Sequence, residues 1–229
     1  MVTVIYEDDT VILVHKKSGI PVQTKRAGEK DMVSILKNYR AKKGEEPYIG
    51  LVHRLDQPVE GVMVFAKTEP ALSHLSRQIS GGKLEKYYRA VVCLQPGEVV
   101  KTGEEYTLTD YLLKDGKSNC SSVTKPSVSG AKKAVLSYCF LNQGEGLAEV
   151  FVKLYTGRHH QIRVQMSHRG YPLAGDRKYG GDLALKAAEG NHIALCAVKI
   201  GFTHPKTLKK VEFSVTPENP IFRKLKEQG

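Results

Sequence analysis

The polar residues between Leu51 and Lys67, in the stretch "LVHRLDQPVEGVMVFAK", are the first in the chain that could do chemistry. His53, Arg54 and Asp56 separate two apolar runs, so they are predicted to lie in a loop between two strands. A carboxylate in such a loop can act as a nucleophile when a nearby cation keeps it charged. An Arg and an Asp in a surface turn more commonly form only a weak exposed ion pair, and the stretch alone leaves both interpretations open.

A second group of polar residues lies in "YTGRHHQIRVQMSHRGYPLAGDRKYG", residues 155–180. The pattern predicts the end of a strand, a Thr-Gly turn and a short helix that carries Arg158, His159, His160, Arg163, His168 and Arg169. Cations at a helix N-terminus favour phosphate or carboxylate, because unpaired backbone N–H groups add to their field. A solvated basic helix is the alternative. Two consecutive histidines diverge on a helix and no carboxylate stands at ligand spacing, so no metal site is predicted.

The third group is "KLEKYYRAVV", residues 83–92, which reads as a strand. On a strand Lys86 and Tyr88 point to one face and Tyr87 points to the other. A tyrosine ordinarily packs in a core or an interface. It becomes a candidate acid or base only where it faces a buried polar group.

Strands must dominate the scaffold that positions these groups. Runs rich in β-branched and aromatic residues predict strands at 3–6, 11–15, 62–66, 87–94, 134–141, 147–155, 194–202 and 211–215. Helices are predicted at 32–43 behind an Asp31 cap, at 70–81 and at 160–169, and the tail is predicted to end in a short helix or to fray. Residues 97–133 are polar and are predicted to form a loop or a mobile hairpin insertion. The prediction is an α+β fold with a mixed, largely antiparallel sheet.

Composition narrows the class of protein. The 229 residues suit one catalytic domain, or two lobes that share a core. Lys and Arg number 35 against 24 Asp and Glu, and the net charge of +11 is typical of nucleic-acid binders without being specific to them. No apolar run approaches membrane-spanning length, and the N-terminus does not read as a leader, so a cytoplasmic protein is expected. The four cysteines are far apart and predict neither a disulfide framework nor a zinc site.

The three groups, taken in order with the opening "IYEDDTVILVHKKSGIPV" and the late "IGFTHP", closely resemble the RluA-type family of RNA pseudouridine synthases. The resemblance extends over nearly the whole chain, roughly residues 4–215. It implies a sheet bent around a central basic cleft with flanking helices. It also implies an enzyme that isomerises a specific uridine in ribosomal or transfer RNA, without cofactor or metal. Because the first strand begins almost at Met1, a member without the small N-terminal RNA-binding module is expected, acting as a monomer on an RNA stem-loop.

Residue roles follow from matching the motifs of that family. Asp56 matches the catalytic nucleophile, which attacks either the ribose or the uracil ring. Arg163 matches the arginine that pairs with this carboxylate, and Tyr88 matches the tyrosine that stacks on the base and assists proton removal. Arg54 matches the arginine that enters the space left when the nucleotide flips out. The further predicted RNA-binding residues are His53, Lys86, Arg158 and His160.

Elementary chemistry supports these roles. A guanidinium keeps a partner carboxylate ionised in a water-poor pocket, and it holds a planar two-point geometry that Lys lacks. Reaching a stacked base requires flipping it out, at a cost of a few kcal/mol that a side chain filling the vacancy helps to offset. Cationic surface supplies affinity for the RNA backbone.

One departure from the family pattern concerns the loop after Asp56. Val59 and Glu60 stand where members often have Thr-Ser, so an acid is expected either to face the RNA-binding site or to point away. Two alternatives to the synthase therefore stay open. One is a non-catalytic RNA-binding protein on the same scaffold. The other is a hydrolase of the same glycosidic bond, which usually needs a second carboxylate and would require Glu60 to turn inward.

Overall fold

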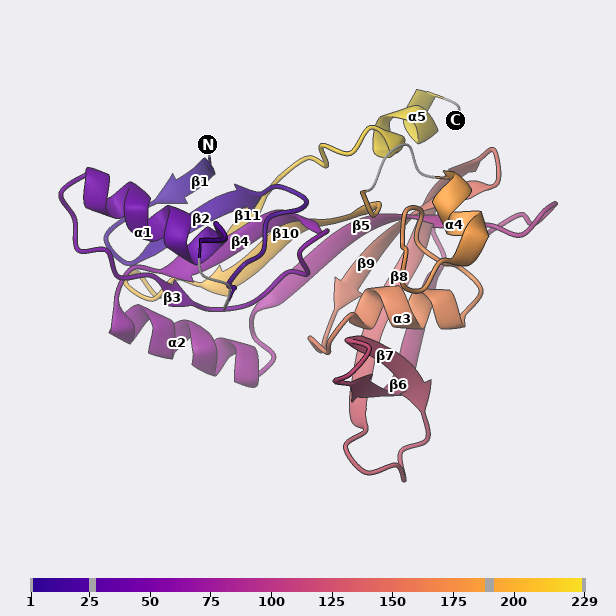
Figure 1. The fold of residues 1–229 in the computed structure, drawn as a ribbon, viewed down its shortest axis with the longest axis horizontal. Coiled ribbons are helices and arrows are strands. Elements are labelled where there is room, and N and C mark those ends of the chain that lie inside the picture. Colours follow the sequence, from indigo (N-terminus) through magenta and orange to yellow (C-terminus); the bar gives the residue numbers. More distant parts are fainter. Residues whose placement is uncertain (1, 25–27, 188–191, 228–229) are drawn as a thin grey trace. The chain divides into compact units, whose positions relative to one another are not determined.

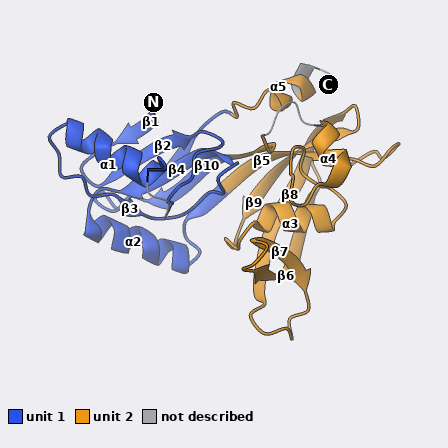
Figure 2. Ribbon diagram, in the orientation of Figure 1, with its two compact units in different colours: residues 1–86, 197–216 blue, residues 87–196, 217–229 orange. Residues whose placement is uncertain are grey.

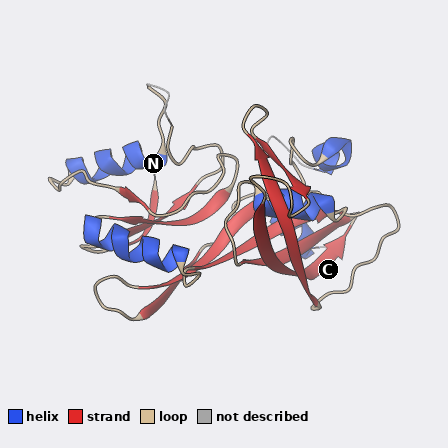
Figure 3. Ribbon diagram, turned by 90° about the horizontal axis from the view of Figure 1, so that it is seen from below, coloured by secondary structure: helices blue, strands red, loops and turns tan. Residues whose placement is uncertain are grey.

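The computed structural model describes residues 2–24, 28–187 and 192–227. The chain forms two compact units, which Figure 2 colours separately. Unit 1 consists of residues 1–86 and 197–216, and unit 2 of residues 87–196 and 217–229. Strands make up most of the regular structure in both (Figure 3). The prediction of an α+β fold with a largely antiparallel sheet is confirmed, and the central basic cleft stays a prediction.

Unit 1 is built on strands in the order β1-β2-β4-β10, with β3 beside β4 and β11 beside β10 (Figure 1). Strand β2 pairs antiparallel with β1 and with β4, and β11 pairs antiparallel with β10. The elements are β1 (Thr3–Glu7), β2 (Val11–Lys16), α1 (Met32–Lys42), β3 (Gly50–Leu51), β4 (Glu60–Ala66), α2 (Glu69–Ser80), the last residues of β10 (Leu195–Thr203) and β11 (Lys210–Ser214).

Strands β2 and β4 are buried along their whole length. Side chains on alternate sides of a strand point to opposite faces, so both faces of this strand pair are covered. On one face the apolar cluster includes Leu13, Val64, and Ala71 and Leu75 of α2. Because the polar residues next to these strands cannot enter such a core without partners, they are confined to the strand ends and the loops.

Gly61 lets β4 approach β10 closely at the edge of the loop that follows Asp56. Its φ is +134°, and a Cβ at this position would lie 2.4 Å from the backbone N and O of Ala197. Only glycine allows so short a separation between two backbones. The start of β4, and with it the loop before it, is therefore fixed against β10.

Unit 2 is built on strands in the order β5-β9-β8-β6-β7. The pairings of β5 with β9, β9 with β8, β8 with β6 and β6 with β7 are antiparallel. The elements are β5 (Glu85–Cys93, from residue 87 on), β6 (Glu105–Asp115), β7 (Cys120–Thr124), β8 (Lys132–Gly144), β9 (Leu147–Leu154), α3 (Gln161–His168), α4 (Gly181–Ala187) and α5 (Ile221–Glu227).

Helix α3 packs on the β6–β7–β8 end of this sheet. Val164 of α3 contacts Leu112 of β6 and Ala134 of β8, with Val123 and Tyr179 against the same cluster. Residues 97–133, predicted as a loop or mobile hairpin insertion, contain β6 and β7, and β6 continues the sheet by pairing with β8. Their polar composition reflects the largely exposed outer positions of these strands, which alternate with buried ones such as Leu108.

The predicted strands and helices agree with the structure to within a few residues at each end. Helix α4 was missed, because its seven residues are too few for a convincing helical period. The helix in the tail is present as α5. Within the residues that the structure describes, no helix has the length and apolarity needed to cross a bilayer.

The capping box at the start of α1 should be a measurable source of stability. Asp31 accepts hydrogen bonds from Ser34 N at 2.7 Å and from Thr24 N at 2.7 Å. Burial alone would raise the pKa of Asp31, but these bonds outweigh it and lower the pKa below its usual value of 3.8. We expect Asp31→Ala to lower the free energy of unfolding by about 1–2 kcal/mol at neutral pH.

The pH dependence of that loss has a definite sign. A depressed carboxyl pKa stabilises the fold above the unfolded-state pKa, and this contribution is lost as the pH falls through the folded-state pKa. Urea unfolding of both proteins should therefore show the difference at pH 7 and a smaller one as the pH falls through the folded-state pKa of Asp31, below 3.8. An equal difference at pH 7 and below this pKa would contradict the assignment of the cap to the ionised carboxylate.

Candidate active site

The loop that carries Asp56 is tied to the loop that follows β2, within unit 1. Gly19 N donates to Gln57 O at 2.9 Å, and Gln57 Nε2 donates to Gly19 O at 3.0 Å. Ser18 Oγ donates to Pro58 O at 2.7 Å. Asp56 itself is half-buried. Reciprocal hydrogen bonds from two directions hold the residues that follow Asp56, so its carboxylate is mounted on a rigid support.

Lys16, the last residue of β2, forms the base of this support. Its side chain is fully buried. The Nζ atom donates to Gln57 O at 3.0 Å, to Ile20 O at 2.8 Å and to Lys17 O at 3.0 Å, so all three ammonium hydrogens join the two loops. Burial lowers the pKa of Lys16 to about 8, and the charges of Asp56 and Glu60 oppose this shift. A cation is thus held within the field of the Asp56 carboxylate.

Arg54 and His53 have different surroundings, although they are adjacent in sequence. Arg54 is exposed, and its Nη2 donates to Gln23 Oε1 at 3.3 Å. His53 Nε2 accepts a hydrogen bond from Val64 N of β4 at 3.2 Å. Burial and the charge of Lys86 lower the pKa of His53 to about 3, so the ring is neutral. His53 therefore attaches the loop to β4 with a neutral ring, and its predicted contact with RNA stays a prediction.

Lys86, the predicted RNA-binding lysine of unit 1, lies in β5. It is half-buried at the end of the first segment of unit 1, and burial lowers the pKa of its ammonium. Its predicted contact with RNA stays a prediction.

Glu60 turns inward, which sequence alone left open. It is the first residue of β4, and only 4% of its surface is exposed. Its Oε2 lies 3.8 Å from His15 Nε2, and its charge acts on Lys16. The acid therefore lies beneath the Asp56 loop, in the body of unit 1.

In unit 2, Arg163 is held by the carboxylate of Asp176. Its Nε donates to Asp176 Oδ2 at 2.8 Å and its Nη2 donates to Asp176 Oδ1 at 2.7 Å. Both side chains are almost fully buried. Asp176 Oδ1 also accepts from Lys178 N at 2.9 Å and from Tyr179 N at 3.2 Å. The two-point pairing fixes the plane of the guanidinium, as charge-assisted bidentate bonds do.

Tyr179 packs beside the Arg163–Asp176 pair. The guanidinium carbon lies 5.1 Å from the centre of the Tyr179 ring. Tyr179 Oη contacts His160 Nδ1 at 2.7 Å and accepts from Ser121 N at 2.8 Å. Burial raises the pKa of Tyr179 to about 12, so its hydroxyl stays protonated.

The other predicted residues of unit 2 are placed as follows. His160 is buried and adopts a left-handed φ of 53° just before α3. Arg158 is exposed, and its Nε donates to Lys133 O at 2.9 Å. Tyr88, in β5, is 5% exposed and pairs with Val152 of β9. Of these three residues, Arg158 offers its guanidinium to solvent, whereas His160 and Tyr88 are buried.

The structure groups Lys16 with the Asp56 loop in unit 1, and Arg163 with Asp176 and Tyr179 in unit 2. The assembly of Asp56, Tyr88 and Arg163 into one site stays a prediction. Sequence reasoning missed Lys16, Asp176 and Tyr179. The signals were available: a lysine ends a strand whose first four residues are apolar, and "AGDRKYG" follows the basic helix at a short distance.

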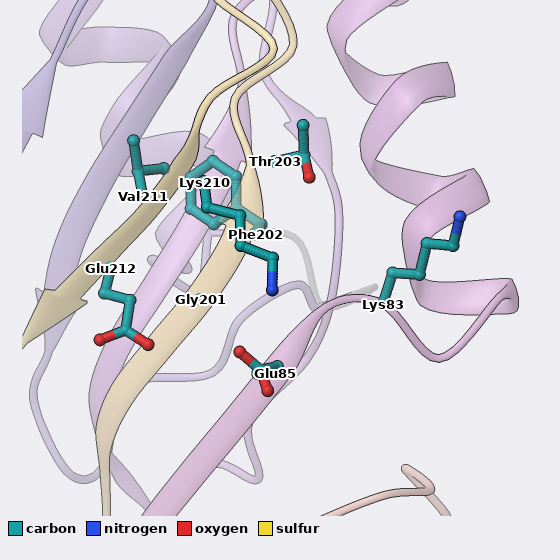
Figure 4. Close-up of a pocket in the computed structure, with 8 residues that line it drawn as sticks. All are labelled: Lys83, Glu85, Gly201, Phe202, Thr203, Lys210, Val211 and Glu212. Atoms are coloured by element: carbon teal, nitrogen blue, oxygen red, sulfur yellow. The ribbon is translucent and has the colours of Figure 1, made fainter.

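A pocket elsewhere in unit 1 is not a candidate for this chemistry. It has a volume of about 260 Å³ and is drawn in Figure 4. Two lysines and two glutamates line it, so its formal charges cancel and it offers no net attraction to phosphate. None of the predicted site residues is among those that line it, which are Lys83, Glu85, Gly201, Phe202, Thr203, Lys210, Val211 and Glu212.

Comparison with known proteins supports the resemblance. Residues 10–168 match the model of the RNA pseudouridylate synthase family. The chain is 34% identical, over 97% of its length, to the ribosomal large subunit pseudouridine synthase D of Neisseria meningitidis serogroup B, of which it spans 60%. It is 32% identical, over 96% of its length, to the ribosomal large subunit pseudouridine synthase C of Buchnera aphidicola subsp. Schizaphis graminum, of which it spans 68%.

The fold is also that of a solved human structure. Human RNA Pseudouridylate Synthase Domain Containing 4 superposes with a TM-score of 0.76 at 19% identity, covering 98% of this chain and 92% of that one. The same overall fold, the family match and the relatives above 30% identity agree with the order of motifs in the sequence. The chain therefore belongs to the RluA-type branch of the RNA pseudouridylate synthase family.

Proposed function

We propose that this protein isomerises uridine to pseudouridine in large-subunit ribosomal RNA. The observation that carries the proposal is the mounting of Asp56: a carboxylate on a loop fixed by a buried ammonium, at the position where the family motif has its nucleophile. The ribosomal substrate is inferred from relatives whose names specify the large ribosomal subunit. A net charge of +11 suits a polyanionic substrate.

The reaction breaks the bond between uracil N1 and ribose C1′ and forms a bond between uracil C5 and C1′. The C5 proton leaves and N1 gains a proton, so atoms balance and no redox change occurs. Asp56 attacks C1′ or the uracil ring and is released when the new bond is complete. The reaction consumes no co-reactant, which agrees with the expectation of no cofactor and no metal.

The remaining residues take the roles that their chemistry allows. Arg163 opposes the Asp56 charge, with Asp176 fixing the guanidinium plane. Tyr88 stacks on the uracil and assists removal of the C5 proton. Arg54, exposed on the same loop as Asp56, fills the space left by the flipped nucleotide. Arg158 contacts the phosphate backbone.

The test is release of tritium from RNA labelled at C5 of uridine. Large-subunit ribosomal RNA should release tritium on incubation with the protein, and transfer RNA serves as the second substrate. Transfer RNA as the only substrate would overturn the ribosomal assignment. The mass of unlabelled product RNA decides between the alternatives: isomerisation leaves it unchanged, whereas hydrolysis removes uracil. Tight binding of both RNAs with no release would favour the non-catalytic interpretation.

A further inference from the structure

Two buried residues of opposite charge, Lys16 and Glu60, lie near the Asp56 loop. Lys16 fixes this loop, whereas Glu60 has no role in the proposed reaction so far. Lys16 and Glu60 are 0% and 4% exposed. A buried charge is costly unless it is compensated, so a buried acid close to a buried ammonium has an electrostatic role in the fold or in the reaction. All residues of this arrangement belong to unit 1.

The hydrogen bonds of Lys16 do not neutralise its charge. Its three acceptors are backbone carbonyl oxygens of Lys17, Ile20 and Gln57, which carry no net charge. Lys16 pairs with Gly61 in the β2–β4 ladder, next to Glu60, and its Nζ donates to the carbonyl of Gln57, next to Asp56. Both carboxylates therefore lie near the ammonium, and their fields favour its protonated form. His15 Nε2, 3.8 Å from Glu60 Oε2, and the Cys196 thiol, within 4.8 Å of the Glu60 carboxylate, are further titratable neighbours of Glu60.

One of these two carboxylates loses its charge temporarily during the proposed reaction. When Asp56 bonds to the substrate carbon, by either route, it becomes an uncharged ester, and Lys16 loses one of its compensating charges. A neutral amine has one donor fewer than an ammonium, so loss of the proton would release one of the three loop carbonyls. The loop would loosen at the stage when the covalent intermediate must be held in place.

We propose that Glu60 is a positioning residue, which keeps Lys16 protonated while Asp56 is esterified, so that the ammonium continues to fix the loop. The inference rests on the proposed function, since it assigns Glu60 a part in that reaction. Glu60 touches neither substrate nor the reacting atoms in this role; it acts through Lys16.

The test is the pH profile of kcat for Glu60→Gln, which keeps the size of the side chain and removes its charge. Because Lys16 would lose its proton more readily, the alkaline limb of the profile should move to lower pH by about one unit, the shift expected of a nearby opposite charge. The alkaline limb of Glu60→Asp, which keeps the charge, should lie near that of the wild type. Glu46→Gln, in an exposed loop of the same unit, is the matched control and should not move the limb. Ionisation of uracil affects the alkaline limb of all variants equally, so it does not produce a shift between them.

A second measurement does not depend on activity. The folded-state pKa of Lys16, about 8, lies below its ordinary value of 10.5, so the unfolded state binds more protons between these values and stability rises with pH there. In Glu60→Gln this rise in stability should begin at lower pH. When Lys16→Met is added to the wild type and to Glu60→Gln, the stability curves of the two resulting proteins should no longer differ in this way. If neither the alkaline limb nor the stability curve of Glu60→Gln is shifted, Glu60 contributes only to packing.

The two failures can be told apart. If the wild type releases no tritium from any RNA, the proposed function fails, while the stability curves still report whether Glu60 and Lys16 are coupled. If the wild type is active and the stability curve shifts but the alkaline limb does not, the coupling exists without bearing on the reaction, and the positioning role is overturned.

Discussion

Asp56→Asn should abolish tritium release from C5-labelled RNA, lowering kcat by at least about a thousandfold, or ~4 kcal/mol in the barrier. Asn has nearly the same shape but cannot act as an ionised nucleophile. The surrounding loop should survive, because its hydrogen bonds use backbone groups and the side chains of Ser18, Gln57 and Lys16.

Binding and stability measurements separate chemistry from folding in this variant. RNA binding by Asp56→Asn should be retained, since affinity for RNA comes largely from Lys and Arg side chains that contact the phosphate backbone. Asp9→Asn, an exposed acid in the same unit whose partner Lys206 is also exposed, is the matched control and should keep full activity. Undiminished release by Asp56→Asn would mean that another group attacks the substrate.

Asp176→Asn should have the second largest effect, on both stability and rate. It removes the charge of the carboxylate that binds the buried Arg163 guanidinium at two points, and breaking a buried ion pair costs about 3–5 kcal/mol. The amide can still accept one bond, so we expect a loss near the lower end, about 3 kcal/mol, in the free energy of unfolding.

The rate should fall because Arg163 loses its fixed plane. A displacement of about 1 Å at a catalytic group can reduce the rate about a hundredfold, and we expect a fall in kcat of that size, measured where the variant is still folded. Asp182→Asn, at an exposed position of α4, is the control and should change neither quantity. Normal kcat in a destabilised Asp176→Asn protein would restrict Asp176 to a structural role.

The sequence by itself determined most of the strands and helices, and the family. Strands β2 and β4 carry unbroken apolar runs because both of their faces are buried, and such runs are legible without a structure. The Asp31 cap of α1 was also predictable, because capping depends on residues within one turn. The candidate nucleophile Asp56 was found because several motifs occur in a fixed order along the chain.

Only the tertiary structure decided which charged side chains lie close to one another. Lys16 and Gln57 are 41 positions apart in sequence, and no local pattern predicts that a lysine ammonium would lie under the Asp56 loop. The motif match named no partner for Arg163 within unit 2, and the structure shows its two-point pairing with Asp176. Glu60 could have faced the RNA or the core. Its burial beside Lys16 and His15 follows from the path of β4 between β2 and β10, because long-range strand pairing brings distant charges within reach of one another.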